Sequence, residues 1–310
     1  MTRITDQLVC HDKYNSAMHE LTHALARARD NDAQIISIVG PTRVGKTKLL
    51  DVFIKDQFSS CNGRHEIVKV VSPKHLTGRA LPDACLRSIG MNPTMFKNHV
   101  AATDTLVKAF LKGGTRLIIF DETQHMLERG TSTSVRAAAD FLKDLFDRLQ
   151  ASIVLAGLPT LLGLFEANEQ LADRARSPIR YYPYGWEGAE YQSYRSALAG
   201  ALEFLVESGW ETLDYNDADF ARRMYVATAG RYGLINKIFM EVQSQHSQRK
   251  VALLDEFFEA YECAVMGRFV AFNPFDVDQP IAVEHMALVY AKVLQEAGVS
   301  QGGQNAALHS

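Results

Sequence analysis

The segment from Gly40 to Thr47, GPTRVGKT, places glycines, a lysine and a threonine at the spacing GxxxxGK[ST]. Glycines let backbone N–H groups turn toward a phosphate, the lysine reaches the β- and γ-phosphates, and the threonine hydroxyl coordinates Mg²⁺. The pattern therefore predicts a loop that binds the phosphates of ATP. An ordinary glycine turn is the alternative, which needs a coincidence of residue types and surroundings. The predicted nucleotide-binding residues are Gly40, Pro41, Thr42, Arg43, Val44, Gly45, Lys46, Thr47 and Lys48.

Two acids, Asp121 and Glu122, directly follow the apolar run LIIF. We expect Asp121 to hold Mg²⁺ together with Thr47, and Glu122 to orient the attacking water while Lys46 neutralises phosphate charge. A solvated or helix-capping acid is the alternative for Glu122. Gln124 is either a sensor of the γ-phosphate or a plain surface glutamine. The two motifs together predict a Mg²⁺-dependent ATPase with ATP and Mg²⁺ as cofactors.

These residues require a sheet that brings the two motifs to one edge. Short runs rich in β-branched residues predict strands at 34–39, 66–71, 116–120, 152–156 and 179–182. Amphipathic periodicity predicts helices at 13–29, 94–112 and 133–150, and a further helix from the phosphate loop to Phe58. Alternating strands and helices predict an α/β domain with a mostly parallel sheet. ATP would bind at the carboxyl ends of its strands.

The pattern changes after about residue 187. Helices are predicted at 188–208, 216–228, 232–247 and 252–263, with no convincing strand between them. The predicted domains are therefore an α/β ATPase domain over 1–187, a helical lid over 188–270 and a C-terminal tail over 271–310. The tail contains a turn-rich stretch, Asn273–Pro280, and a short helix near 282–297. It is either a partner-docking segment or a terminal linker.

Composition limits the remaining classes of function. The net charge of -3 means that DNA contact requires a local basic patch. The four cysteines form no CxxC pair, which disfavours zinc fingers and a disulfide framework and favours a reducing compartment. No apolar run approaches the roughly 20 residues of a membrane helix, and no signal peptide is recognisable. We expect a cytoplasmic protein without a membrane partner.

With both nucleotide motifs in place, the chain resembles the AAA+ ATPases of transposition, the TnsC/TniB family, over about residues 10–265. Besides these motifs, the resemblance is carried by DETQHML at 121–127, IVLAGLPT at 153–160, EQLADR at 169–174 with YYPYGW at 181–186, and TAGRYGLI at 228–235. It implies a P-loop NTPase of AAA+ type with a small all-helical lid.

The resemblance also implies that an arginine from a neighbouring subunit completes the catalytic site. Arg174 matches the family position, and Arg176 is its backup; a structural salt bridge is the alternative. Arg231 is the candidate lid sensor. The sequence departs from many AAA+ proteins at the end of the fourth predicted strand, where no polar side chain occurs before Thr160. Slow hydrolysis is therefore expected.

Family members assemble as rings or filaments around duplex DNA, which implies a homo-oligomer here. Two basic loops are candidate DNA contacts, through Lys74, Arg79, Arg129 and Arg136. The alternative is that these loops are solvated surface.

The resemblance implies an ATP-dependent transposition regulator in the bacterial cytoplasm. It would oligomerise on double-stranded DNA, link a target-selection protein of the TniQ type to the transposase, and be reset by hydrolysis. The alternatives are an AAA+ protein resembling a helicase loader, or a signalling scaffold ATPase that binds no DNA.

Overall fold

The structure, a computed structural model, describes residue 4 and residues 12–58, 65–128 and 131–299. The chain divides into two compact units. The sheet unit comprises 16–40 and 46–181, and the helical unit comprises the described residues of 1–15, 41–45 and 182–310. Among the described helices, none is both long and apolar enough to span a membrane.

Five parallel strands form the centre of the sheet unit. They are β1 (Ile35–Val39), β2 (Ile67–Val71), β3 (Leu117–Asp121), β4 (Ser152–Gly157) and β5 (Ile179–Arg180). Their order is β2-β3-β4-β1-β5. Every residue of β1, β3 and β4 is buried, which explains their nearly unbroken apolar sequences. Because the strands are parallel, their carboxyl ends share one edge of the sheet, as the sequence predicted.

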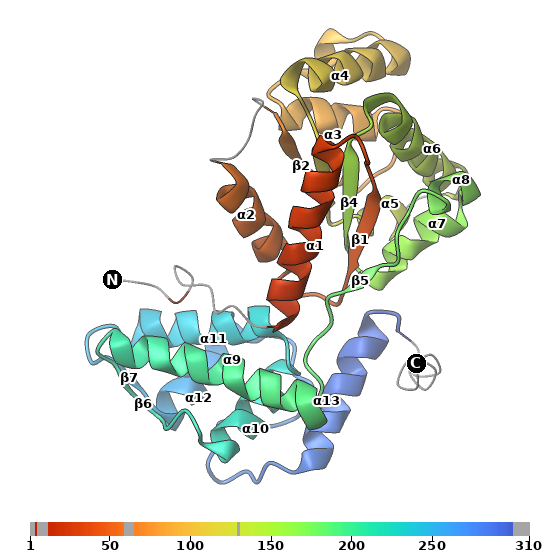
Figure 1. The fold of residues 1–310 in the computed structure, drawn as a ribbon. Helices are drawn as coiled ribbons and strands as arrows, with labels where there is room; N and C mark the ends of the chain where they lie inside the picture. The colour runs from red at the N-terminus through yellow and green to blue at the C-terminus, as the bar shows by residue number, and fades with distance from the viewer. Residues whose placement is uncertain (1–3, 5–11, 59–64, 129–130, 300–310) are drawn as a thin grey trace. The chain divides into compact units, whose positions relative to one another are not determined.

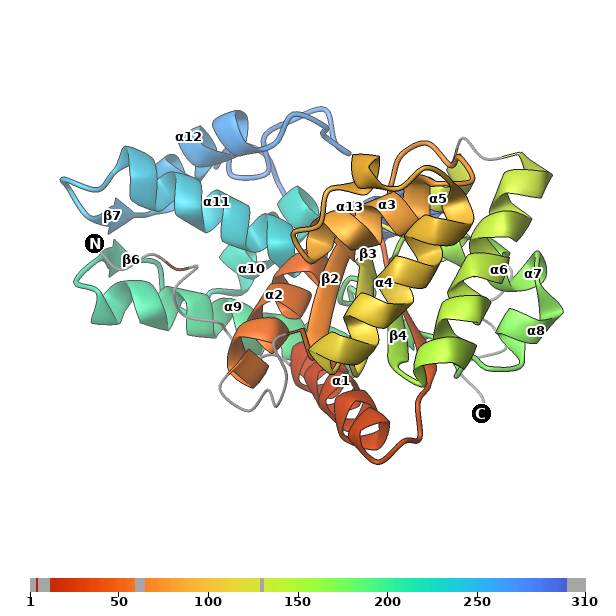
Figure 2. The ribbon, with the colours of Figure 1, turned by 90° about the horizontal axis from the view of Figure 1, so that it is seen from above.

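The longer helices of the sheet unit are those predicted from periodicity, with one addition. They are α1 (Asp12–Arg29, within this unit from Ser16), α2 (Lys46–Gln57), α3 (Ala80–Ser88), α4 (His99–Gly113) and α6 (Ser132–Leu149). Their arrangement around the strands is visible in Figures 1 and 2. The addition is α3, which packs on α4 and β2. It spans only 9 residues and has Pro82 in its first turn, so periodicity alone gave no clear signal.

Several short elements connect these helices and strands. They are η2 (Pro93–Met95), α5 (His125–Glu128), η3 (Pro159–Leu162), α7 (Gly163–Glu166) and α8 (Glu169–Ala172). The helix predicted at 94–112 begins only at His99, and residues 94–95 belong to η2. Periodicity did not predict the other short elements, because helices of one turn carry too few residues to show a period.

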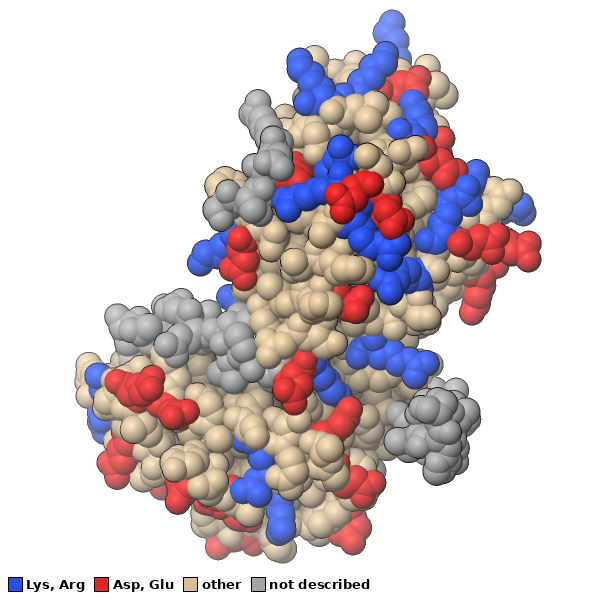
Figure 3. All heavy atoms as spheres, in the orientation of Figure 1, with Lys and Arg blue, Asp and Glu red and all other residues tan. Residues whose placement is uncertain are grey.

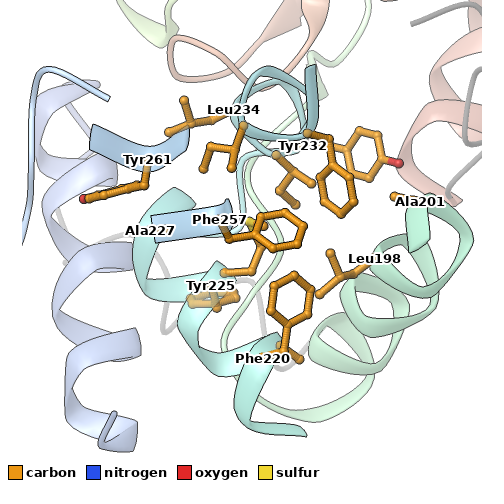
Figure 4. Packing of buried hydrophobic residues seen from close by; sticks show 14 of the residues in the cluster. Leu198, Ala201, Phe220, Tyr225, Ala227, Tyr232, Leu234, Phe257 and Tyr261 are labelled. Carbon is orange, nitrogen blue, oxygen red and sulfur yellow. The ribbon is translucent and has the colours of Figure 1, made fainter. Parts of the chain in front are cut away.

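The helical unit contains α9 (Gly188–Glu207), α10 (Ala218–Thr228), α11 (Tyr232–Gln245), α12 (Leu254–Ala264) and α13 (Val283–Glu296). Two-residue strands, β6 (Glu211–Thr212) and β7 (Val251–Ala252), pair in parallel where the sequence predicted no strand. Figure 4 shows side chains of α9, α10 and α12 meeting in one apolar core. Phe257 lies at its centre. The centroid of its ring is 4.8 Å from that of Phe220 and 5.1 Å from that of Phe239.

The segment between α12 and α13 is packed against this core. Phe275 is buried, and its ring lies 5.6 Å from Phe257. The buried guanidinium of Arg223, on α10, donates hydrogen bonds to the carbonyls of Pro274, Asp276 and Gln279. The turn-rich stretch of the sequence is therefore held in place by a buried arginine and a buried phenylalanine.

Candidate functional site

The predicted phosphate-binding loop connects the end of β1 to the start of α2. Gly40 donates its N–H to the carbonyl of Gly157, at the end of the neighbouring strand β4, at 3.1 Å. The backbone is left-handed at Arg43 (φ 64°) and Gly45 (φ 106°). Glycine readily adopts a φ of 106°, whereas other residues rarely do, so the motif requires a glycine at position 45. Helix α2 then begins at Lys46, so the positive end of its dipole adjoins the loop.

Lys46 lies buried beside the two predicted acids. Its Nζ donates to the Gly40 carbonyl at 2.7 Å, which holds the ammonium at the base of the loop. Burial lowers the pKa of Lys46 to about 8, and the negative charges of Glu122 and Asp121 partly oppose that shift. The two sequence motifs come together at the end of β4, because Gly40 donates its N–H to the Gly157 carbonyl and Thr123, next to Glu122, donates its N–H to the Ala156 carbonyl.

Asp121 is the last residue of β3, and its side chain is almost fully buried. Its Oδ1 accepts the N–H of Glu122 at 3.0 Å, and its Oδ2 lies 3.2 Å from the Nζ of Lys69. Thr47, the other predicted Mg²⁺ ligand, is exposed in the first turn of α2. A buried carboxylate and an exposed hydroxyl are oxygen ligands of the kind Mg²⁺ prefers.

Lys69, on β2, was not identified from the sequence. Its ammonium lies between Asp121 and Asp51 of α2, with 2.6 Å to the Asp51 carboxylate. Burial acts to lower the pKa of Lys69, but its hydrogen bonds and charge interactions with Asp51 and Asp121 outweigh burial, so the pKa is raised. Val71 is the register partner of Asp121, so side-chain alternation puts Lys69 on the same sheet face as Asp121. A lysine inside an otherwise apolar strand is the signal that could have revealed it.

Glu122 occupies an unusual backbone conformation. Its φ is 55°, in the left-handed region that residues other than glycine rarely adopt. Such outliers cluster at functional sites. Its side chain is 44% exposed, so water can reach the carboxylate. Oε2 accepts a hydrogen bond from Nε2 of Gln124 at 2.6 Å.

Gln124 is only 4% exposed, so it is not a surface glutamine. Its Oε1 accepts the N–H of Leu158, just after β4, at 3.1 Å. The side chain thus connects the loop after β3 with the end of β4. The sequence left Gln124 as either a phosphate sensor or a surface glutamine, and its neighbours are visible only in the fold.

The two arginine-finger candidates form contacts within the sheet unit. Arg174 makes a two-pronged ion pair with Asp147, at 2.8 and 3.1 Å, and donates to the Gln170 carbonyl at 2.6 Å. Arg176 donates to Gln34 at 3.2 Å and lies 3.6 Å from Glu20. These contacts match the alternative of a structural salt bridge, and a role toward a neighbouring subunit stays a prediction.

Arg231, the candidate lid sensor, precedes α11 in the helical unit and is buried. Its Nε donates to the Thr228 carbonyl at 2.8 Å, and the guanidinium lies 5.1 Å from the centre of the Phe269 ring. Burial, followed by the positive charge of Arg43, lowers the pKa of Arg231 to about 10. Its observed contacts are structural, and sensing of nucleotide stays a prediction.

The candidate DNA contacts differ in their surroundings. Lys74 and Arg136 are exposed. Arg79 instead donates to the carbonyls of Phe96 and Pro93, at 2.7 and 2.8 Å, and pairs with Asp83. Its guanidinium therefore fastens the loop before α4 to α3. Arg129 lies outside the described residues.

Three solved structures have a similar fold. The ORC2 protein of Aeropyrum pernix, solved as ADPNP–ADP complexes, matches with a TM-score of 0.61 and 12% identity, covering 85% of this chain and 72% of that one. Cdc6p of Pyrobaculum aerophilum matches with a TM-score of 0.60 and 13% identity, covering 92% and 80%. A Walker-type ATPase of Pyrococcus abyssi matches with a TM-score of 0.58 and 13% identity, covering 96% and 91%.

At such low identity these matches establish the fold alone. It is a P-loop ATPase fold of AAA+ type, with helices around a parallel sheet and a helical part after it, as the sequence predicted. Among curated proteins, none matches the sequence.

A family model provides the closer assignment. The model described as bacterial TniB protein matches residues 3–180, which is more than half of the chain and includes the phosphate loop and both acids. The chain therefore belongs to the TniB family, as its sequence motifs indicated.

Proposed function

We propose that this protein is a Mg²⁺-dependent ATPase. The observation that carries the proposal is that the phosphate loop and the acidic pair meet at the end of β4, where Gly40 donates to Gly157 and Thr123, next to Glu122, donates to Ala156. The loop N–H groups and Lys46 would hold the phosphates, and Thr47 and Asp121 would hold Mg²⁺. The metal, when bound, neutralises phosphate charge. Glu122, with its exposed carboxylate, would orient and deprotonate the attacking water.

The variant Glu122→Gln tests this assignment. We expect kcat to fall by about 100-fold, the lower end of what a positioned general base contributes. The Kd of a fluorescent ATP analogue should stay within about threefold, because the phosphate-binding residues are unchanged. The matched control is Glu128→Gln, an exposed acid of the adjoining helix α5, which should hydrolyse ATP at the normal rate. Normal turnover by Glu122→Gln would disprove the assigned role.

We further propose that the ATPase regulates DNA transposition in the bacterial cytoplasm. Membership of the TniB family supports this proposal. In it, ATP-bound subunits oligomerise on double-stranded DNA, and the assembly links a target-selection protein of the TniQ type to the transposase. Hydrolysis resets the assembly, so ATP acts as a ligand coupled to subunit association. Exposed cations such as Lys74 and Arg136 are available for phosphate contacts.

A further inference from the structure

We propose that Gln124 is a positioning residue that fixes the carboxylate of Glu122 relative to the end of strand β4. The proposal rests on the ATPase function proposed above. Strand β4 ends in Ala156 and Gly157 and is followed by Leu158, and none of the three carries a polar side chain. Gln124 supplies a polar group at that place from the neighbouring loop.

Chemistry fixes the orientation of the Gln124 amide. The backbone N–H of Leu158 is a donor, so the amide atom facing it, at 3.1 Å, must be the oxygen. The amide NH₂ then has to face the other way, toward Oε2 of Glu122 at 2.6 Å. An ionised carboxylate only accepts hydrogen bonds, so both contacts require the same orientation.

The glutamine is the fixed member of this pair. It is almost fully buried, whereas the Glu122 side chain is 44% exposed. The residue between them is tied to both flanking strands, because Thr123 donates its N–H to Ala156 at 2.9 Å and its hydroxyl to Phe120 at 3.0 Å. The position of the glutamine therefore determines where the exposed carboxylate points.

Gly157 provides the space that Gln124 occupies. A Cβ at this position would overlap Oε1 of Gln124, and it would also lie 3.1 Å from the backbone nitrogens of Gln124 and Thr123. No side chain larger than hydrogen fits there without displacing the glutamine. The absence of a side chain at Gly157, on β4, therefore leaves room for the side chain of Gln124, which follows β3.

Loss of this hydrogen bond would change the rate of hydrolysis and leave nucleotide binding intact. A freed Glu122 carboxylate can rotate into solvent or toward His125, whose Nε2 is 3.8 Å away. A misplaced base lowers kcat, because its contribution depends on being within hydrogen-bond reach of the water. Affinity for ATP depends on the phosphate loop, and Gln124 is not part of that loop.

Two substitutions test the proposal together. Gln124→Glu keeps an acceptor for the Leu158 N–H but removes the donor to Glu122. Gln124→Met keeps the approximate length and removes both hydrogen bonds without adding charge. We expect kcat to fall at least tenfold in both variants, with the KM of Gln124→Met and its Kd for a fluorescent ATP analogue within threefold of the original values. Gln34→Met is the control. Gln34 is also buried, but it precedes β1 and so lies at the end of that strand opposite to the phosphate loop.

A double-mutant cycle separates positioning from a purely structural role. If Gln124 acts through Glu122, then Glu122→Gln with Gln124→Met is no slower than Glu122→Gln alone. Gly157→Ala should reproduce the kcat loss of Gln124→Met, with nucleotide affinity retained. Normal kcat in both Gln124 variants, or losses that multiply in the cycle, would overturn the proposal while leaving the ATPase assignment standing. Normal kcat in Glu122→Gln itself would overturn both.

Discussion

At the scale of single residues, Lys69 is an internal cation for the predicted metal-binding carboxylate. Asp121 is nearly fully buried, and its Oδ2 is 3.2 Å from the Lys69 ammonium. A buried carboxylate is costly unless it is paired and hydrogen-bonded. Lys69 therefore supplies the buried carboxylate of Asp121 with an ion-pair partner, and it links β3 to α2 through Asp51.

The variant Lys69→Met should destabilise the protein in the absence of nucleotide. Asp121 would lose its cationic partner, and we expect the free energy of unfolding to fall by about 1–3 kcal/mol. This cost is smaller than that of breaking a fully buried ion pair, because Lys69 is partly exposed. The raised pKa of Lys69 means that its contribution is complete below the unfolded value of about 10.4 and disappears only as pH rises through the folded value. Denaturant unfolding at about pH 7.5 therefore measures the full effect.

The control for this measurement is Lys108→Met, which removes an exposed lysine of α4. It should leave the free energy of unfolding within about 0.5 kcal/mol of the original. Equal stability of the two variants would show that the Lys69 pair contributes nothing measurable.

At the scale of secondary-structure elements, the turn between α10 and α11 organises the helical unit. Ala229 and Gly230 are both left-handed, with φ of 51° and 68°. Gly230 accepts the N–H of Tyr184 at 3.1 Å, and the carbonyl of Tyr184 accepts the hydroxyl of Tyr225, on α10, at 2.7 Å. The turn thus fastens the segment before α9 to the core of the unit.

Gly230→Ala should destabilise the helical unit. A Cβ there would lie 2.5 Å from the Tyr184 carbonyl oxygen, and the left-handed backbone adds about 1–2 kcal/mol for any residue with a Cβ. We expect a loss of at least about 2 kcal/mol, seen as a fall of several degrees in Tm. Gly267→Ala is the matched control in the same unit, because nothing lies within 4 Å of a Cβ there. Similar Tm values for both variants would refute the role of this turn.

At the scale of the whole molecule, charge of both signs is spread over the surface. The net charge is -3, and Figure 3 shows Lys and Arg interspersed with Asp and Glu on the visible face. Attraction to DNA must therefore come from particular loops. The guanidinium of Arg79 is hydrogen-bonded to backbone carbonyls, so Lys74 and Arg136 are the remaining candidates for DNA contact among the described residues. An arginine finger at a subunit interface would likewise require Arg174 to leave Asp147.

The salt dependence of DNA binding tests these contacts. Fluorescence anisotropy of a random-sequence duplex should show cooperative binding that requires ATP. Removing Lys74 and Arg136 together should reduce the slope of log K against log salt by about 1.8, since each phosphate contact contributes about 0.9. Lys108→Ala with Lys112→Ala removes the same charge from exposed positions of α4 and should leave the slope unchanged. Absence of binding at low salt in every nucleotide state would favour the scaffold alternative.

The sequence alone determined the nucleotide motifs and the elements that carry them. The phosphate loop is contiguous, so residue types at fixed spacing specify its chemistry directly. Buried parallel strands are uniformly apolar, so β1, β3 and β4 stand out, and the longer helices follow from their periodicity. The order of the strands and the short helix α3 carried no such local signal.

Only the tertiary structure decided which residues contact one another around the predicted site. Lys69 reaches Asp121 through strand register, and Gln124 reaches Leu158 because β3 and β4 are neighbours. Arg79 and Arg174 have sequence contexts that fit binding or catalysis, yet the described contacts of both guanidinium groups lie within the sheet unit. The contacts Lys69–Asp121, Gln124–Leu158, Arg79–Pro93 and Arg174–Asp147 join residues at least 14 positions apart. Spacing along the chain cannot encode such pairs, because their distances are set by packing between elements.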